Sequence, residues 1–377
     1  MRVAILETVK TTGGFEQEFD RLIIRELQRQ GHDPILYLPE NSSLPVDFGI
    51  PIDYVRGGEI VDYEGAGHLK KIWLSIQREH RRINWFDSAY EKACRHEVDA
   101  IILTTATYRY LRSLHKSKLK NSPIPIIFIF LGVNPQEKPK FLKQARKCKP
   151  YSNIKLKVTT LRDDFKEDNV QNVDIITTPP ALLPEGIAVN PILTYKEPIR
   201  IGFFGHYRKG EKDIDGIIHA FLRCDLNHEA EFVVQAAPTG PDDQKDMNRI
   251  MRKYGKEPSV RFIKGKVFGK AWYDLLQSVD VLFLPYSNPR YLYNWSAVYF
   301  NAIALYKPVL TTAVLNPEIL REYRIGSEVD INNLDTLTEQ MHDFLVGYKQ
   351  MLSIYQENLN RVNKDFSTQI FIKNVLK

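Results

Sequence analysis

Cysteine is scarce in this chain of 377 residues. The three that are present, Cys94, Cys148 and Cys224, lie far apart in the sequence. An odd number at these spacings fits neither a disulfide framework nor a zinc site. The sequence therefore predicts a protein of a reducing compartment, and we expect no metal ion and no cofactor.

Long hydrophobic runs are also missing. The apolar run at Arg2–Leu6 is too short for a signal peptide. The most apolar later segment, residues 124–133, has about half the length of a membrane span and contains Pro125. We therefore expect a cytoplasmic protein without a transmembrane helix. Tandem repeats and low-complexity tracts are absent from the sequence as well.

Positive charge is concentrated in one region. The chain has a net charge of +6, whereas residues 100–157 hold 13 Lys or Arg and one acid, Glu137, which gives 13 − 1 = +12. Such a region suits an anionic partner: a membrane surface, a phosphate-bearing acceptor or nucleic acid. Solvated helix faces would give the same pattern. Nucleic acid is the least favoured partner, because no recognisable nucleic-acid-binding module is present.

The length predicts two domains of roughly 150 to 200 residues each. The best boundary is residues 178–198, which contain five prolines, because so many restricted residues suit a crossing segment better than a helix or strand. We therefore expect an N-terminal domain at residues 1–183, a linker at 184–198, a second domain at 199–345, and C-terminal helices at 346–377 that cross back to the N-terminal domain.

Both halves alternate short apolar runs with amphipathic helical patterns, which predicts α/β domains with parallel sheets. The first half opens with a strand at Arg2–Leu6, a glycine-containing loop, a helix from Phe15 that stops at Gly31, and a second strand. Residues 45–60 are expected to form a loop. Further strands are expected at 100–103, 124–130, 155–160, 173–178, 199–204, 231–235, 260–263, 279–284 and 307–311, and late helices at 334–362 and 368–376.

Residues 69–96 carry a long amphipathic pattern in which aromatic residues alternate with cations. Trp73, Trp85 and Phe86 are the largest apolar members. Two interpretations remain open: a helix that lies on a membrane surface, or a helix that packs this stripe into the core. Together with the basic region, the pattern favours association of the first domain with an anionic membrane surface through residues 116–157.

The second half opens with the loop between a buried strand and an amphipathic helix. Gly205 is expected to end the strand, and His206, Arg208 and Lys212 follow it. The helix is expected to start near Asp213, so its free N–H groups would face the same space as the cations. This arrangement suits a phosphate group, although an ordinary loop with solvated cations would have the same sequence.

Several motifs together resemble the GT-B glycosyltransferases, in particular the large retaining family known as GT4. The segment Gly205–Lys212 resembles the phosphate loop of that family, and residues 278–287, SVDVLFLPYS, resemble a characteristic strand. Residues 301–309, NAIALYKPV, and 317–320, PEIL, resemble the turn that follows. The Gly-Gly-x-Glu of the first loop is matched by residues 13–16. The resemblance covers most of the chain and implies two Rossmann-like domains facing a cleft.

The resemblance implies transfer of a sugar from a nucleotide-diphosphate donor to a glycan or lipid-linked acceptor, in surface polysaccharide or glycoconjugate synthesis. The second domain would hold the nucleotide and the first domain the acceptor. Lys212 and Arg208 would be catalytic, because cations beside the departing diphosphate stabilise the transition state. No protein base is needed in a retaining member, since the departing phosphate takes the acceptor proton. The donor-binding residues would be Gly13, Gly14, Gly205, His206, Lys266, Tyr293, Asn294, Ser296, Ala297 and Asn301.

The sequence departs from the family at two carboxylates. The family usually has two glutamates eight positions apart, where this chain has Tyr293 and Asn301. The Asn301 amide can still hydrogen-bond a ribose hydroxyl, in which case its side chain would face the cleft; otherwise it is a packing or capping residue. A histidine that the family often has after the 124–130 strand is replaced here by Leu131 or Gly132.

These departures leave a second function open: a catalytically inactive GT-B protein that binds a glycan or a partner enzyme. A nucleotide-dependent epimerase is a third possibility, but the sequence offers no convincing pair of acid and base carboxylates. A nicotinamide-dependent dehydrogenase is disfavoured, because no Gly-x-Gly-x-x-Gly follows either leading strand. The expected location is cytoplasmic, with peripheral attachment to the inner face of the membrane.

Overall fold

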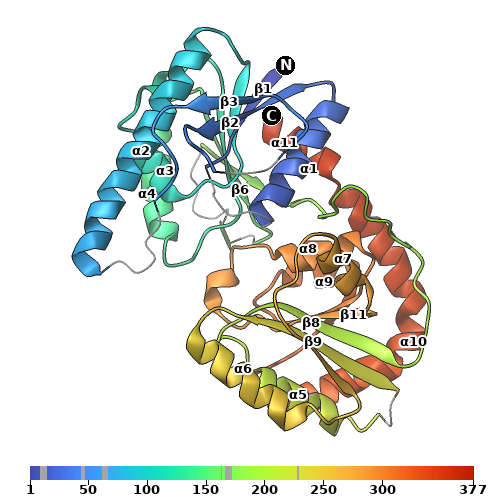
Figure 1. The fold of residues 1–377 in the computed structure, drawn as a ribbon. Helices are drawn as coiled ribbons and strands as arrows, with labels where there is room; N and C mark the ends of the chain where they lie inside the picture. The colour runs from blue at the N-terminus through green and yellow to red at the C-terminus, as the bar shows by residue number, and fades with distance from the viewer. Residues whose placement is uncertain (9–14, 44–46, 62–66, 163, 166–171, 227–228) are drawn as a thin grey trace. The chain divides into compact units, whose positions relative to one another are not determined.

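The computed structural model describes residues 1–8, 15–43, 47–61, 67–162, 164–165, 172–226 and 229–377. The chain forms two compact units (Figure 1). The first unit contains residues 1–179 together with 368–377, and the second contains residues 180–367. The chain therefore passes between the units twice, at 179–180 and at 367–368.

The first unit is built on a parallel sheet of seven strands in the order β3-β2-β1-β4-β5-β6-β7. The strands are β1 (Arg2–Leu6), β2 (Asp33–Pro39), β3 (Ile52–Val55), β4 (Ala100–Leu103), β5 (Ile126–Phe130), β6 (Ile154–Thr159) and β7 (Val173–Ile176). The helices are α1 (Phe15–Arg29), α2 (His68–Cys94), α3 (Tyr108–Leu114), the 3-10 turn η1 (Lys118–Asn121), α4 (Lys138–Cys148) and α11 (Thr368–Leu376).

The interior strands of the first unit form its apolar core. Strands β4 and β5 are buried along their whole length, as expected for parallel strands covered on both faces. The last helix, α11, completes this core by packing against α1, where the rings of Phe19 and Phe371 lie 5.8 Å apart. The C-terminal residues of the chain therefore belong to the N-terminal unit.

The second unit has a six-stranded parallel sheet in the order β10-β9-β8-β11-β12-β13. The strands are β8 (Ile199–Tyr207), β9 (Ala230–Pro238), β10 (Val260–Ile263), β11 (Val281–Leu284), β12 (Val309–Thr311) and β13 (Gly326–Glu328). The helices are α5 (Ile214–Arg223), α6 (Pro241–Tyr254), α7 (Lys270–Gln277), the 3-10 turn η3 (Pro289–Tyr291), α8 (Ala297–Ala304), α9 (Pro317–Tyr323) and α10 (Leu334–Asp365).

In both sheets the first strand lies in the interior, and the strand order reverses beside it. Strand β1 pairs with β2 on one side and β4 on the other, and β8 pairs with β9 and β11. In open α/β sheets, ligands bind outside the carboxyl ends of the strands at this reversal point. The loops after β1 and β8 are therefore the places to look for a site in each unit.

The prediction of two α/β domains with parallel sheets is confirmed, and three details differ. Residues 45–60 include the strand β3, and β13 was not predicted. Both are short edge strands with few buried residues, so they lack the apolar run of an interior strand. Strand β8 does not end at Gly205 but continues to Tyr207, with Gly205 at a φ of 124° inside it.

Residues 180–198 contain no helix or strand and lie along the second unit. The backbone N–H groups of Ala181 and Leu182 donate to the carbonyls of Phe366 and Phe300. Further along, Gln356 of α10 accepts a 2.6 Å hydrogen bond from the N–H of Leu193. We call residues 180–198 the strap.

Helix α10 runs without a break across residue 346, where the sequence analysis placed a boundary. Of the C-terminal helices, α11 alone belongs to the first unit.

No helix within the described residues has the length and apolar character required to cross a bilayer.

Candidate functional site

The loop between β8 and α5 has a defined geometry. Gly205, near the end of β8, and Gly210, in the loop, adopt positive φ values of 124° and 80°, which residues with a Cβ rarely adopt. Asp213 caps α5 by accepting a 3.0 Å hydrogen bond from the N–H of Gly216. The prediction that the helix starts near Asp213 is confirmed, since Asp213 is the N-cap and Ile214 the first helical residue. The loop thus places the N-terminus of α5 at the carboxyl edge of the sheet.

Lys212 is the buried cation of this loop. The residue is only 7% exposed, and its Nζ donates a 2.9 Å hydrogen bond to the carbonyl of His206. The ammonium lies 5.0 Å from the ring centre of Phe203 and 4.7 Å from that of Tyr286. Burial lowers the pKa of Lys212 to about 8. Among the described residues no carboxylate forms an ion pair with it, so the positive charge is available to an anionic ligand.

Other cations surround the same loop. Burial, and then the positive charges of Lys212, Lys266 and Arg208, lower the pKa of His206. The structure therefore brings together four of the residues predicted for the site. Arg290 of η3, which was not predicted, adds a further cation, and it forms a 3.0 Å ion pair with Glu211. The arrangement has an excess of positive charge at the carboxyl end of β8, as an anion site requires.

Gln235 holds the end of β8 and the loop after β10 together. Its side chain is buried in the middle of β9, accepts a 3.1 Å hydrogen bond from the N–H of Gly205, and donates a 2.6 Å hydrogen bond to the carbonyl of Gly265. The end of β8 is thereby tied to the loop after β10. The sequence signal for this role is a single amide within the apolar run at residues 232–238, and the sequence analysis missed it.

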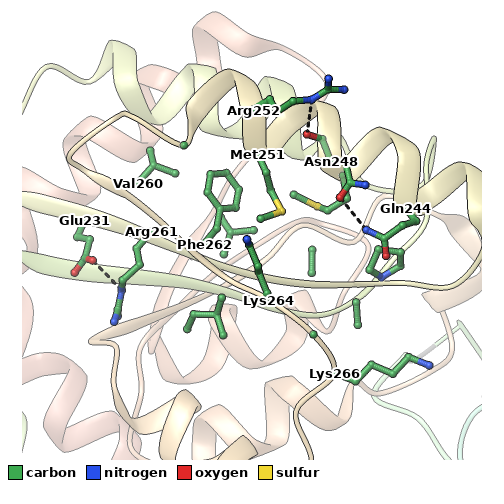
Figure 2. Close-up of a pocket in the computed structure, with 18 of the residues that line it drawn as sticks. Glu231, Gln244, Asn248, Met251, Arg252, Val260, Arg261, Phe262, Lys264 and Lys266 are labelled. Atoms are coloured by element: carbon green, nitrogen blue, oxygen red, sulfur yellow. Dashed lines mark hydrogen bonds and ion pairs between the residues drawn. The ribbon is translucent and has the colours of Figure 1, made fainter.

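A groove of about 1190 Å³ lies beside these loops, between α6 and strands β9 and β10 (Figure 2). Its floor is apolar, with Val234, Met247 and Phe262 among its residues. Figure 2 shows Lys264 and Lys266 following β10, with Asn248 and Met251 of α6 also lining the groove. The groove thus offers apolar surface close to the cations, a combination that suits an aromatic base joined to phosphate.

The turn before α8 holds several predicted donor-binding residues. Ser296 is the N-cap of α8, its side chain accepting a hydrogen bond from the N–H of Tyr299, and Ala297 is the first helical residue. Asn294 donates a 2.9 Å hydrogen bond to the carbonyl of Arg290, and Tyr293 is buried. These contacts fix the turn; their predicted role toward a donor remains a prediction.

Asn301 lies on the buried face of α8, 4% exposed. Its Nδ2 donates a 2.9 Å hydrogen bond to the carbonyl of Leu182 in the strap. The structure therefore gives this side chain a packing contact within the second unit. The predicted contact with a nucleotide stays a prediction. Gly13 and Gly14, the other predicted donor contacts, lie outside the described residues.

The first unit has a buried polar cluster at the corresponding edge of its sheet. Glu7, directly after β1, accepts a 3.4 Å hydrogen bond from Thr104, directly after β4. Asp20 of α1 is fully buried beside them. Burial, and next the charge of Glu7, raise the pKa of Asp20 well above its ordinary value. Our sequence analysis did not identify these two carboxyls as a pair.

The basic region is only partly an exposed surface. Lys157 is buried and forms a 2.7 Å ion pair with Asp174, and Lys116 lies 2.8 Å from Glu79. The idea that Trp85 and Phe86 contact lipid is wrong, because both are fully buried. They lie on the inner face of α2, where the ring of Phe86 packs against that of Phe128 at 6.1 Å.

In the described part of the chain, no group of three or more His, Cys, Asp or Glu could hold a metal ion.

No protein-family model matches the sequence, and no curated protein is significantly similar to it. Solved structures, however, share its fold over the whole chain. HepE of Anabaena, in complex with UDP and glucose, is 14% identical with a TM-score of 0.65 and covers 100% of this chain and 98% of its own. Sucrose-phosphate synthase of Thermosynechococcus elongatus is 11% identical, with a TM-score of 0.66 over 99% and 96%.

A third similar structure is WaaG, a glycosyltransferase involved in lipopolysaccharide biosynthesis. It is 15% identical, with a TM-score of 0.61, and covers 99% of both chains. At these identities the similarity establishes the fold and not the activity. The chain therefore has the GT-B fold, with two Rossmann-like units of seven and six parallel strands.

Proposed function

We propose that this protein is a glycosyltransferase that takes a sugar from a nucleotide-diphosphate donor. The observation that carries the proposal is Lys212, a buried ammonium without a carboxylate partner in the described chain, placed directly before the N-terminus of α5. Two similar structures support the donor class, since HepE was solved with UDP and also with UDP-glucose.

The diphosphate would bind where the cations converge. Breaking the anomeric C–O bond leaves negative charge on the departing diphosphate, and Lys212 together with Arg208 would stabilise that charge more strongly in the transition state than in the ground state. The N–H groups at the start of α5 would add fixed positive potential. The base would occupy the apolar groove next to Lys266. The hydrogen bonds of Gln235 would fix the position of this groove relative to the end of β8.

The finer assignment follows the family resemblance. We propose a GT4-like enzyme that retains the anomeric configuration, with an acceptor that is a glycan or lipid-linked saccharide, in surface polysaccharide or glycoconjugate synthesis. The acceptor would be bound by the first unit. A cytoplasmic location at the inner face of the membrane would suit a lipid-linked acceptor.

Nucleotide titration by calorimetry tests the donor site. We expect UDP, GDP or ADP, alone or as its sugar conjugate, to bind the wild-type protein, and Lys212→Met to weaken that binding at least tenfold. Lys212→Arg should retain much of it, because the charge is kept. Lys349→Met, which removes a cation on α10, is the matched control and should bind normally. If none of these nucleotides binds, the proposed donor class is wrong.

Release of free nucleotide from the donor sugar tests the chemistry. We expect Lys212→Ala to lower turnover on the order of 10²-fold under saturating donor, and Arg208→Ala to lower it less. An inactive binding protein is the second candidate, favoured by the burial of Tyr293 and by the contact between Asn301 and Leu182. That candidate predicts no turnover by the wild-type protein, even in the presence of a panel of saccharide acceptors.

A further inference from the structure

An apolar stripe is exposed on the first half of α2. Leu69, Ile72, Trp73 and Ile76 are 82%, 50%, 60% and 63% exposed. Their spacing of i, i+3, i+4 and i+7 places them on one side of the helix. Figure 1 shows this half of α2 extending beyond α3 and α4. Four large apolar side chains gathered in two turns are a patch, in contrast to the single exposed residues that any protein surface carries.

The stripe faces away from the core of its own unit. The buried residues of the helix, which include Leu74, Trp85, Phe86 and Ala89, lie on the opposite side. The helix is held in this orientation just beyond the stripe, where Glu79 pairs with Arg112 and Lys116 of the α3 region at 3.1 and 2.8 Å. The stripe therefore takes no part in the packing of the first unit.

The charge around the stripe indicates its partner. Lys70 and Lys71 are exposed in the same turn, and the first turn of α2 contains no acid. Helix α3 contacts both α2 and α4, and further cations are exposed on these neighbouring elements. They are Arg109, Lys116, Lys118, Lys140, Lys143, Arg146, Lys147 and Lys149. An apolar stripe with Lys70 at its side, on a unit that exposes many cations, complements a bilayer with anionic headgroups.

We propose that the first half of α2 inserts its stripe into the interface of an anionic membrane, with Trp73 at the depth of the headgroups. Lipid binding through the stripe does not depend on the proposed transferase activity. It rests on that function only for its biological purpose. A second copy of this chain is a poorer occupant, because its stripe would offer apolar contact while the first turn of α2 contains no acid to pair with Lys70. Apolar contact and charge attraction act together only at the lipid surface.

Vesicle co-flotation of the full chain tests the proposal. The protein should float with vesicles of equal parts phosphatidylcholine and phosphatidylglycerol, and much less with phosphatidylcholine alone. The triple variant Ile72→Ser, Trp73→Ser, Ile76→Ser should lose at least tenfold in affinity, and Lys70→Gln with Lys71→Gln should lose affinity for the anionic vesicles only. The matched control is Phe268→Ser, which removes a 58% exposed side chain from the second unit and should bind like the wild type.

Equal flotation of the wild type and the triple variant would overturn the proposal, as would absence of flotation of the wild type at low salt. Sedimentation analysis covers the other occupant: a wild-type dimer that the triple variant converts to monomers, without any lipid binding, would assign the stripe to a second copy. The single variant Trp73→Ser guards against misfolding of the triple variant. Nucleotide binding should be unchanged in every stripe variant, so failure of the donor site and failure of the lipid surface give separate readouts.

Discussion

The side-chain amide of Asn301 donates a 2.9 Å hydrogen bond to the carbonyl of Leu182, 119 residues earlier in the chain. This bond fastens the start of the strap to α8 in a buried position. Asn301→Ala would leave the Leu182 carbonyl without this donor. We expect the free energy of unfolding to fall by about 1 to 3 kcal/mol, measured by chemical denaturation, with Asn360→Ala on the exposed face of α10 as the control.

The same Asn301→Ala variant distinguishes the two roles considered for this residue. If the amide serves only the strap, the nucleotide Kd stays at the wild-type value while stability falls. If the amide also contacts the nucleotide, the Kd rises by a factor that corresponds to about 1 to 2 kcal/mol. A variant with unchanged stability would contradict the structural role that the Leu182 contact assigns.

Nucleotide affinity should depend on pH through Lys212. Its pKa of about 8 means that the ammonium is charged at pH 7 and increasingly neutral above pH 8. The attraction for phosphate is therefore present below pH 8 and lost as the pH rises, and we expect the Kd to increase about tenfold between pH 7 and pH 9. Titrations across this range test the effect. Lys212→Arg should show a flat profile, because the guanidinium stays protonated.

Removing the amide of Gln235 should loosen the site. Gln235→Leu keeps the apolar volume of the side chain but leaves the Gly205 N–H and the Gly265 carbonyl without their partner. We expect the nucleotide Kd to rise at least tenfold, since the end of β8 and the loop after β10 lose their fixed separation, with a loss of stability of about 1 to 3 kcal/mol. Gln350→Leu, at an exposed position of α10 away from the groove, is the control. Wild-type affinity in Gln235→Leu would show that the bridge has no part in binding.

Asp20→Asn should stabilise the protein at neutral pH. The raised pKa of Asp20 means that the folded state retains a proton that the unfolded state releases. Stability is therefore unaffected by this group at pH values below about 4, and it decreases as the pH rises from there toward the folded-state pKa. An amide has no such cost and can donate to Glu7. Thermal unfolding at pH 4 and pH 7.5 should show a higher midpoint for the variant at pH 7.5 only.

Elements with local patterns were predictable from the sequence, and long-range contacts were not. Strands such as β4 and β5 are buried on both faces, so their apolar runs stand out, whereas the edge strand β3 is largely exposed and does not. In the site, the cations near α5 follow one another in the sequence and could be recognised as a group. Arg290 and Gln235 come from distant elements, so only the fold shows that they join the loop.

The position of α11 has a consequence for how the chain folds on the ribosome. The core of the first unit includes residues 368–377, which are synthesised after the whole of the second unit. During synthesis the surface of α1 around Phe19 therefore stays exposed until Phe371 and its neighbours leave the ribosome. We expect the second unit to complete its fold first. The first unit should need protection from aggregation for longer during synthesis.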